Sequence, residues 1–358
     1  MLRDPPLDTR RATDPGTTAA TKFSAIIPLY NGEATIASTL ESVLAQTFAP
    51  VDIVVVDDGS TDNGAEIVAR YQDRVTLLRM EGNSGVQMAR NYAIAQSGGN
   101  WIALCDQDDL WAPDYLARVA ALVAAEPQLE FVFTNFRRTF HDVPEPHTKF
   151  DQAPPTFWQE AERRIRPEGW VFNRQIAGLT FVWHPMFPSG TVLTRQLIDA
   201  VGGFDPTMRG RRPEDGEFTL RCLYRAVTGA IPDPLVTIRR HDLNFSRDTV
   251  LGLVDEVEVL QFIRAHHEEA RPFWPVIDNQ IRRRRIQAAH GAFARRDHAL
   301  LRRLLADIDP VDRSVVLRAK AIVASLPSPL DIWTNSVLQR LSMELRQQPR
   351  RDAGNMPL

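Results

Sequence analysis

The sequence predicts an α/β protein in which helices cover both faces of a mostly parallel sheet, followed by a C-terminal helical region. Short apolar runs, typical of buried parallel strands, alternate with amphipathic helical patterns over the first half of the chain. The links between them are short, which favours a sheet covered on both faces. From about residue 250 onward the pattern is helical throughout.

The first half of the chain is predicted to contain five strands with helices between them. These strands are Phe23–Leu29, Val51–Val56, Val75–Leu78, Trp101–Leu104 and Glu130–Thr134. Apolar residues on one face mark the first helix, including Ile36 and Leu40. Ser60 or Thr61 is suited to cap the second helix, and a later helix is expected at Asp114–Ala125.

The second half changes character after the fifth strand. His141–Pro188 is rich in proline and aromatic residues, and we expect a variable loop or helical insertion there. Its rings either stack on a sugar or an acceptor, or pack beneath the loop. The remaining elements are strands at Ser189–Leu193 and Ile231–Ile238, a helix at Arg195–Val201, a helix opened by Glu214 and Asp215, and a last helix carrying Trp333, Val337, Leu341 and Leu345.

Composition narrows the class of protein. The 358 residues suffice for one large domain and an appended region, and the net charge of −3 argues against nucleic-acid binding. Two cysteines favour a reducing compartment, so we expect a cytoplasmic location. No apolar run approaches the length of about 18 residues that a membrane-spanning helix needs. Residues 1–21 are polar and predict a disordered tail rather than a signal peptide.

A basic run lies in the C-terminal region. Between Ile281 and Arg303 there are eight arginines and a single acid, Asp297. Such a run is either a solvated helix face or a surface for anionic lipid headgroups or a lipid-phosphate acceptor. The second reading predicts peripheral contact with the inner face of the cell membrane.

Polar residues follow three of the predicted strands. They are Tyr30 and Asn31, Asp57 and Asp58, and the segment Asp106–Asp109. Because ligands bind beyond the carboxyl ends of parallel strands, these residues are expected to meet in one crevice. The carboxylates of Asp106, Asp108 and Asp109 cannot all ionise cheaply without a cation, so a divalent metal is expected. The alternative is a solvated turn in which Asp109 or Asp114 caps the next helix.

Two common phosphate-binding patterns are missing from the sequence. No G-x-G-x-x-G follows the first strand, and the P-loop signature is absent. A metal held by the Asp-rich segment would therefore have to neutralise any bound phosphates.

Six motifs in order resemble the family 2 glycosyltransferases. They are IIPLYNGE, VVVDDGSTD, NSGVQMARN, LCDQDDLWAPD, GGFD and the Glu214-Asp215 pair. The resemblance implies a Rossmann-like GT-A domain at residues 22–249 with a variable insertion at 141–188, followed by a helical region at 250–358. It also implies a nucleotide-sugar donor, most commonly a UDP-sugar, an Mn²⁺ or Mg²⁺ ion, and hexosyl transfer with inversion. The family's usual setting is bacterial surface polysaccharide or glycolipid synthesis, with a saccharide or lipid-linked acceptor.

The resemblance also implies a role for each matching residue. Donor binding is implied for Pro28, Tyr30, Asp58, Asn83, Gly85, Arg90, Asp106 and Gln107, and metal binding for Asp106, Asp108 and His241. His241 belongs to a late segment with Asn244 and Ser246. Asp215 corresponds to the catalytic base, and Glu214 and Trp111 are expected on the acceptor side. Gly216 departs from the family pattern, which usually has a bulky residue after the acid pair, and this predicts a looser helix start.

The expected chemistry needs a cation at the leaving diphosphate, a base for the acceptor hydroxyl and an aligned pair of substrates. For Glu214 and Asp215 the competing interpretation is helix capping and compensation of the helix dipole. One alternative function is a catalytically silent nucleotide-sugar-binding scaffold. A sugar nucleotidyltransferase is another, although it would need a Gly-rich segment ending in Arg directly after the first strand, where Tyr30-Asn31-Gly32-Glu33 stands.

Overall fold

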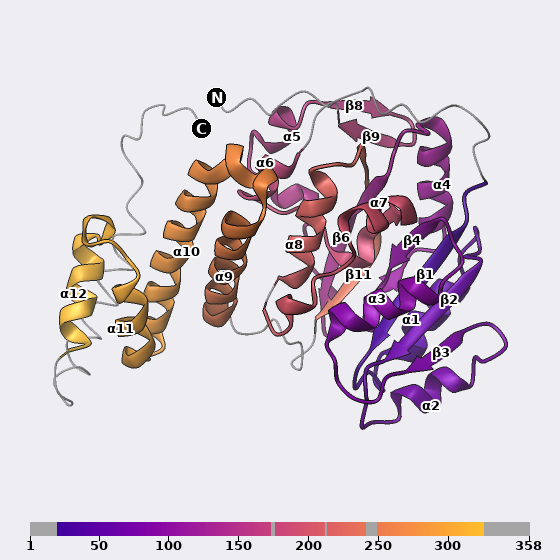
Figure 1. Cartoon of the computed structure of the whole chain (residues 1–358), viewed down its shortest axis with the longest axis horizontal. Coiled ribbons are helices and arrows are strands. Elements are labelled where there is room, and N and C mark those ends of the chain that lie inside the picture. Colours follow the sequence, from indigo (N-terminus) through magenta and orange to yellow (C-terminus); the bar gives the residue numbers. More distant parts are fainter. Residues whose placement is uncertain (1–19, 173–175, 212, 241–248, 326–358) are drawn as a thin grey trace. The chain divides into compact units, whose positions relative to one another are not determined.

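The computed structural model describes residues 20–172, 176–211, 213–240 and 249–325. They form two compact units, one within residues 4–244 and the other mainly within 245–358 (Figure 1). The expected N-terminal tail lies almost wholly outside the described residues.

The first unit is built on one mixed sheet with the strand order β3-β2-β1-β4-β10-β6-β11-β9-β8. Its strands are β1 (Phe23–Leu29), β2 (Asp52–Asp57), β3 (Thr76–Arg79), β4 (Trp101–Leu104), β5 (Leu110–Trp111), β6 (Phe131–Phe140), β7 (Val143–Pro144), β8 (Arg163–Arg166), β9 (Gly169–Phe172), β10 (Thr191–Thr194) and β11 (Thr228–Arg240). Strands β1 to β4 are parallel, whereas β10 pairs antiparallel with both β4 and β6. The predicted parallel sheet is thus confirmed for β1–β4 and interrupted at β10.

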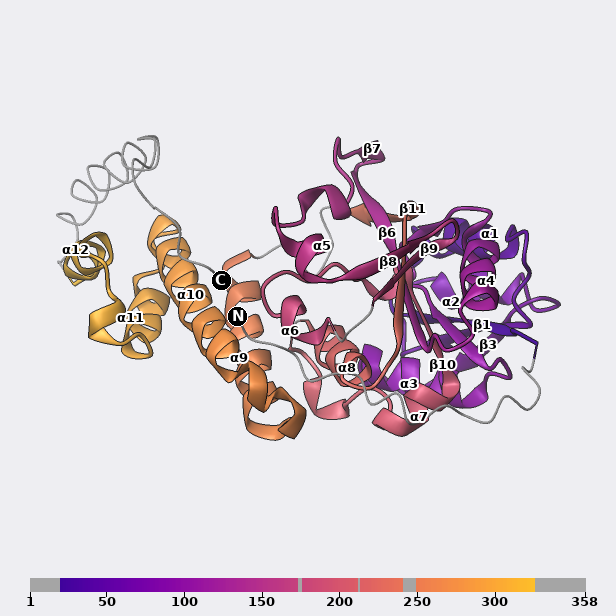
Figure 2. The same cartoon turned by 90° about the horizontal axis from the view of Figure 1, so that it is seen from above.

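Helices cover both faces of this sheet (Figure 2). The α-helices of the unit are α1 (Ile36–Leu44), α2 (Gly64–Ala69), α3 (Val86–Gln96), α4 (Tyr115–Ala125), α5 (Phe157–Glu160), α6 (Ala177–Thr180), α7 (Arg195–Val201) and α8 (Glu214–Leu223), with 3₁₀ turns η1 (Phe150–Gln152), η2 (Pro188–Gly190) and η3 (Pro206–Met208). Alternate residues of β1, such as Ala25 and Ile27, share a buried core with α1, α2 and α4. Helix α3 packs on β1 and β2 from the other face.

Most predicted elements are confirmed, β1 and α7 with their predicted bounds. The predicted caps are wrong. Helix α2 begins only at Gly64, after Asn63, so neither Ser60 nor Thr61 caps it. Asp114 precedes α4 as expected but its side chain accepts no capping hydrogen bond.

The insertion at 141–188 corrects the expectation of a loop or a helical segment. It contributes β8 and β9, and β9 pairs antiparallel with β11, so the insertion extends the sheet. Its rings pack on one another: the ring centroids of Phe150 and Trp158 are 4.7 Å apart, and those of Phe157 and Trp183 are also 4.7 Å apart. The packing interpretation of these aromatic residues is therefore confirmed.

The second unit is helical, as predicted. It contains α9 (Thr249–His266), α10 (Trp274–Ala294), α11 (His298–Ala306) and α12 (Val315–Val323), with 3₁₀ turns η5 (Glu268–Phe273) and η6 (Pro310–Asp312). Phe293, Leu301 and Leu317 lie in its core. The last predicted helix, from Trp333 to Leu345, lies outside the described residues. Among the helices that the structure describes, none has the length and apolar character needed to cross a bilayer.

Part of the basic run, which extends from α10 to α11, has polar partners within this unit. Arg282 Nε lies 3.0 Å from an Asp312 carboxylate oxygen, Arg284 pairs with Glu256, and Arg285 donates to the Asp307 carbonyl at 2.9 Å. Arg283, Arg302 and Arg303 are exposed. The solvated-face reading thus applies to only part of the run.

Candidate functional site

The Asp-rich loop, residues 105–109, leaves the end of β4 and is fastened from several elements. The Asp106 N–H donates to Ser189 Oγ at 2.9 Å. Thr39 Oγ1 of α1 donates to the Gln107 carbonyl at 2.8 Å. Arg239 at the end of β11 donates to the Asp108 carbonyl and, at 2.7 Å, to Ser38 Oγ. The loop is therefore held rigidly at the carboxyl end of the sheet.

The third carboxylate of this loop does not face the expected metal. Asp109 is 1% exposed, accepts a hydrogen bond from Ser189 Oγ and another from the Arg239 N–H at 3.2 Å. Burial, together with the charges of Asp108 and Asp106, raises the pKa of Asp109 well above its usual value. The expectation that three carboxylates act together is wrong, because Asp109 supports the loop from inside. It does not cap α4 either.

Gln107 joins the Asp-rich loop to the end of β1. Its Oε1 accepts from the Tyr30 N–H at 2.7 Å and its Nε2 donates to the Tyr30 carbonyl at 3.0 Å. The Tyr30 side chain is 44% exposed, whereas Pro28 is buried within β1. Of the residues expected around the base, Tyr30 is thus the accessible one, and Gln107 serves to hold its main chain.

Asp58 holds the glycine-containing segment that opens α3. Its carboxylate oxygens accept from the Ser84 N–H at 2.6 Å and the Gly85 N–H at 2.8 Å. Gly85 has a φ of 100°, a conformation that side-chain-bearing residues rarely adopt. Asn83 is tied by its carbonyl to Arg209 Nη2 at 2.8 Å. The expected donor-binding segment is therefore shaped by Asp58 and by Arg209, which sequence reasoning missed.

Arg90 connects the Asp-rich loop to the acid pair on α8. It is 2% exposed; its Nη2 lies 2.6 Å from Asp106 Oδ1 and its Nη1 lies 3.6 Å from Glu214 Oε1. Burial would lower the pKa of Arg90, but the charges of Asp106, Glu214 and Asp215 raise it above its usual value. The guanidinium also lies 5.2 Å from the centroid of the Phe204 ring. Arg90 is thus a buried link between two acidic segments, with little surface left for a nucleotide.

The first turn of α8 carries Glu214 and Asp215 beside this link. Burial and then the charge of Asp215 raise the pKa of Glu214 to about 7, although Arg90 opposes the shift. Both acids are half-buried. Gly216 does not loosen the helix start: α8 runs through it, and an added Cβ would lie 3.2 Å from Pro213 Cγ. A larger residue would need Pro213 to shift by a few tenths of an ångström, so the structure favours a small residue where the family usually has a bulky one.

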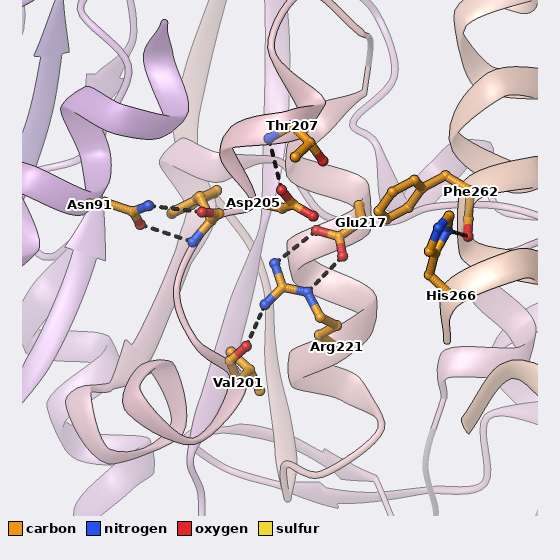
Figure 3. A network of polar contacts seen from close by, with 9 residues as sticks. Asn91, Val201, Asp205, Thr207, Glu217, Arg221, Phe262 and His266 are labelled. Carbon is orange, nitrogen blue, oxygen red and sulfur yellow. Dashed lines mark hydrogen bonds and ion pairs between the residues drawn. The ribbon is translucent and has the colours of Figure 1, made fainter. Parts of the chain in front are cut away.

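A second set of contacts holds the GGFD segment and α8 in place (Figure 3). The Asn91 side chain bonds both main-chain groups of Phe204, at 2.8 and 2.9 Å. Gly203 has a φ of 73°, and an added Cβ would lie 2.8 Å from Asn91 Oδ1. Glu217 pairs with Arg221, which also donates to the Val201 carbonyl at 2.6 Å. Asn91 follows Arg90 on α3, so one helix positions both acidic segments.

Trp111 is not on an acceptor surface: it is 3% exposed, its Nε1 donates to the Ser189 carbonyl at 2.8 Å, and its ring packs on Tyr115. His241, with Asn244 and Ser246, lies outside the described residues. Ser189 and Arg239 were missed as supports of the loop, since a serine at a strand start and an arginine at a strand end carry no distinctive signal.

The carboxylate oxygens of the Asp-rich loop suit a hard divalent cation that also binds substrate phosphates. Within the described ranges no group of three His, Cys, Asp or Glu residues is arranged to hold a metal. Asp106 and Asp108 are the half-buried carboxylates of the loop, and Arg90 neutralises one of them. Mg²⁺ is usually bound by one or two carboxylates together with substrate phosphates, so the residues present fit such an ion.

The family model and two of the relatives that match this sequence are described as glycosyltransferases. The sequence model of "Glycosyl transferase family 2" matches residues 24–181. An uncharacterized glycosyltransferase of Haemophilus influenzae is 26% identical over 257 residues, covering 70% of this chain and 80% of the relative. The UDP-Glc:alpha-D-GlcNAc-diphosphoundecaprenol beta-1,3-glucosyltransferase WfgD of Escherichia coli is 36% identical over 114 residues, or 32% of this chain. The match spans only 45% of WfgD.

Comparison with solved structures shows a shared fold. A TarS structure from S. aureus in complex with UDP-GlcNAc superposes with a TM-score of 0.59 at 18% identity, covering 92% of this chain and 94% of that one. The GT-A architecture expected for the first unit, with a helical region after it, is thereby confirmed.

Proposed function

Because the chain belongs to the family 2 glycosyltransferases, we propose that it transfers a sugar from a nucleotide-sugar donor to an acceptor hydroxyl with inversion. The observation that carries this proposal is the arrangement around Arg90. That buried cation links Asp106 of the Asp-rich loop to Glu214 of the α8 acid pair. A metal-binding loop and a candidate base are thus held on one support.

Donor binding is proposed at the carboxyl ends of β1, β2 and β4. Tyr30 offers an accessible ring to the base, and the segment at Asn83 and Gly85 forms a wall that Asp58 holds. Asp106 and Asp108, with His241, would hold Mn²⁺ or Mg²⁺, which stabilises negative charge on the leaving diphosphate when bound. UDP is the proposed nucleotide, supported by the UDP-sugars named for WfgD and TarS.

Asp215 is proposed as the base that takes the proton of the acceptor hydroxyl. It lies in the first turn of α8, beside Glu214, and among the described residues its carboxylate makes no hydrogen bond or ion pair. A carboxylate that is positioned but not engaged is available for proton transfer. Arg90 and Glu214 are proposed as positioning residues, because their ion pair holds the first turn of α8, which carries Asp215.

The acceptor is proposed to be a saccharide or a lipid-linked saccharide in bacterial surface polysaccharide or glycolipid synthesis. The acceptor named for WfgD, a GlcNAc-diphosphoundecaprenol, supports this setting. Peripheral membrane contact through the exposed Arg283, Arg302 and Arg303 belongs to the same proposal. Flotation with anionic vesicles tests it: substitution of these three by Gln should abolish association, and unchanged flotation would refute membrane contact.

The test of the enzyme is a transfer and donor-hydrolysis assay with a panel of nucleotide sugars and Mn²⁺. The change Asp215→Asn should lower turnover by about 10²–10⁴-fold, because the base is lost. Thermal shift with UDP should be unchanged in the same variant, because the proposed role of Asp215 is on the acceptor and not on the nucleotide. Retained turnover in Asp215→Asn would refute this residue as the base. Nucleotide binding without any turnover in the wild type would instead support a silent binding protein.

A further inference from the structure

Three cations gather where the insertion meets the ends of β6 and β11. Arg138 lies on β6 and Arg240 on β11, and the register pairs Arg138 with Ile238 and Arg240 with Phe140. The two arginines are therefore two positions apart on neighbouring strands and share one face of the sheet. Lys149, just before η1, is fixed by its N–H, which donates to the Phe136 carbonyl at 2.9 Å. These three residues are called the basic cluster.

Aromatic rings line the basic cluster. Lys149 Nζ lies 4.6 Å from the centroid of the Trp183 ring, and the Arg138 guanidinium lies 5.5 Å from that of Phe136. Lys149 and Arg138 are half-buried, while Arg240 is exposed. Rings of this kind favour cations but do not neutralise them.

The charges of the basic cluster are not balanced within the part of the chain that the structure describes. None of Arg138, Lys149 and Arg240 makes an ion pair there. Burial, followed by the charges of Arg138 and Arg240, lowers the pKa of Lys149 to about 8. Glu145 is the acid whose charge acts on Arg138.

Neighbouring arginines have structural partners, in contrast. Arg137 donates to the Glu145 carbonyl at 2.8 Å, and Arg239 is bonded to the Asp-rich loop and to α1. Like charges that are half-buried without a counter-ion are costly unless a bound anion offsets them. Among these neighbouring cations, the side chains of the basic cluster are the ones for which the described residues supply neither a hydrogen-bond acceptor nor an ion-pair partner.

We propose that the basic cluster binds a phosphate or diphosphate group of the acceptor. Arginine forks bind phosphate oxygens in pairs, and a phosphate monoester carries a charge of about −1.5 to −2, which matches several cations better than one carboxylate does. Arg239, which precedes Arg240 on β11, bonds the Asp-rich loop, so one strand carries both a support of that loop and a member of the basic cluster. The assignment to the acceptor rests on the proposed function.

The test compares the double variant Arg138→Gln/Lys149→Gln with the wild type, using inorganic pyrophosphate as a probe in excess EDTA. Chelation prevents metal-assisted binding at the Asp-rich loop, so remaining binding in calorimetry reports on the cluster. We expect at least a tenfold loss of pyrophosphate affinity in the double variant. Lys149→Arg keeps the charge and should keep the affinity. Arg74→Gln, an exposed arginine near the opposite edge of the sheet, is the matched control and should bind like the wild type.

Acceptor kinetics complete the test. KM should rise at least tenfold in the double variant for an acceptor with a phosphate monoester or a lipid diphosphate, and stay unchanged for the phosphate-free sugar. The better of the two charged acceptors identifies the source of the phosphate. Equal pyrophosphate binding in all variants, or an equal rise of KM for charged and uncharged acceptors, would overturn the proposal. Absence of both transfer and donor hydrolysis in the wild type would refute the proposed function instead, while the pyrophosphate result would still decide the binding site.

Discussion

Six carboxylates around the candidate site of the first unit fall into two groups that differ in what balances their charge. Asp57, Asp58 and Asp109 are at most 5% exposed and accept hydrogen bonds from main-chain N–H groups or a hydroxyl. Asp106, Glu214 and Asp215, in contrast, act on one buried cation, Arg90. The first group builds the loops. In the second, negative charge exceeds positive charge, which is the condition for attracting a cation and accepting a proton.

The strongest test of this contrast is removal of the shared cation. Arg90→Gln should lower the free energy of unfolding by about 3–5 kcal/mol, because it leaves the half-buried carboxylates of Asp106 and Glu214 without their buried partner. The stability of Arg90→Lys should lie between that of the wild type and that of Arg90→Gln, since an ammonium ion cannot bond both acids as a guanidinium fork does. Urea unfolding followed by circular dichroism measures both. If Arg90→Gln lowered the free energy of unfolding by less than about 1 kcal/mol, Arg90 would not be the group that balances the charges of Asp106 and Glu214.

The pH dependence of the unfolding free energy tests whether Glu214, in the second group, has a raised pKa. Its pKa of about 7 lies above the usual value, so protonation of Glu214 favours the folded state. This contribution is complete below about pH 4.3, the usual pKa of Glu, and is lost as the pH rises through 7. The unfolding free energy of Glu214→Gln relative to wild type should therefore increase by up to about 3 kcal/mol between pH 4 and pH 8. Parallel pH profiles of the two proteins would contradict the raised pKa.

The smallest effect is expected at a solvated ion pair. Arg79 and Glu66 lie 3.2 Å apart with 57% of each side chain exposed. Arg79→Gln should change the unfolding free energy by about 0–1 kcal/mol, since water screens both charges. It serves as the charge-matched control for Arg90→Gln. A loss similar to that of Arg90→Gln would mean that the burial of Arg90 is not what makes it important.

Sequence reasoning predicted the strands and helices of the first unit well where one face or both faces are buried. Phe23–Leu29 is apolar except for Ser24 and continuously buried, so pattern and structure coincide. The short strand β8 was missed because Arg163–Arg166 is mostly exposed and pairs only at the sheet's edge. Strand β9 was missed as well, although it is mostly buried and pairs with both β8 and β11. Antiparallel β10 was expected as a strand, but its direction is set by its neighbours rather than by its own residues.

The candidate site was predictable in its position and less so in its details. The acids at the strand ends meet around α3, as the topology of a parallel sheet requires. Which carboxylate turns inward could not be read from the sequence, since Asp109 is buried through its partners Ser189 and Arg239, which lie far away in the chain. The aromatic ring of Trp111 likewise gave no sign that it belongs to the core.

Helix α3 has a consequence for the dynamics of the unit. Its N-terminal segment is fastened to Asp58 through the amides of Ser84 and Gly85, and one residue after Arg90 its Asn91 fastens the amide of Phe204. A displacement of this one helix would open both fastenings at once. The protection of these three amides against hydrogen exchange should therefore rise and fall together, and a nucleotide that slows exchange at Gly85 should slow it at Phe204 as well.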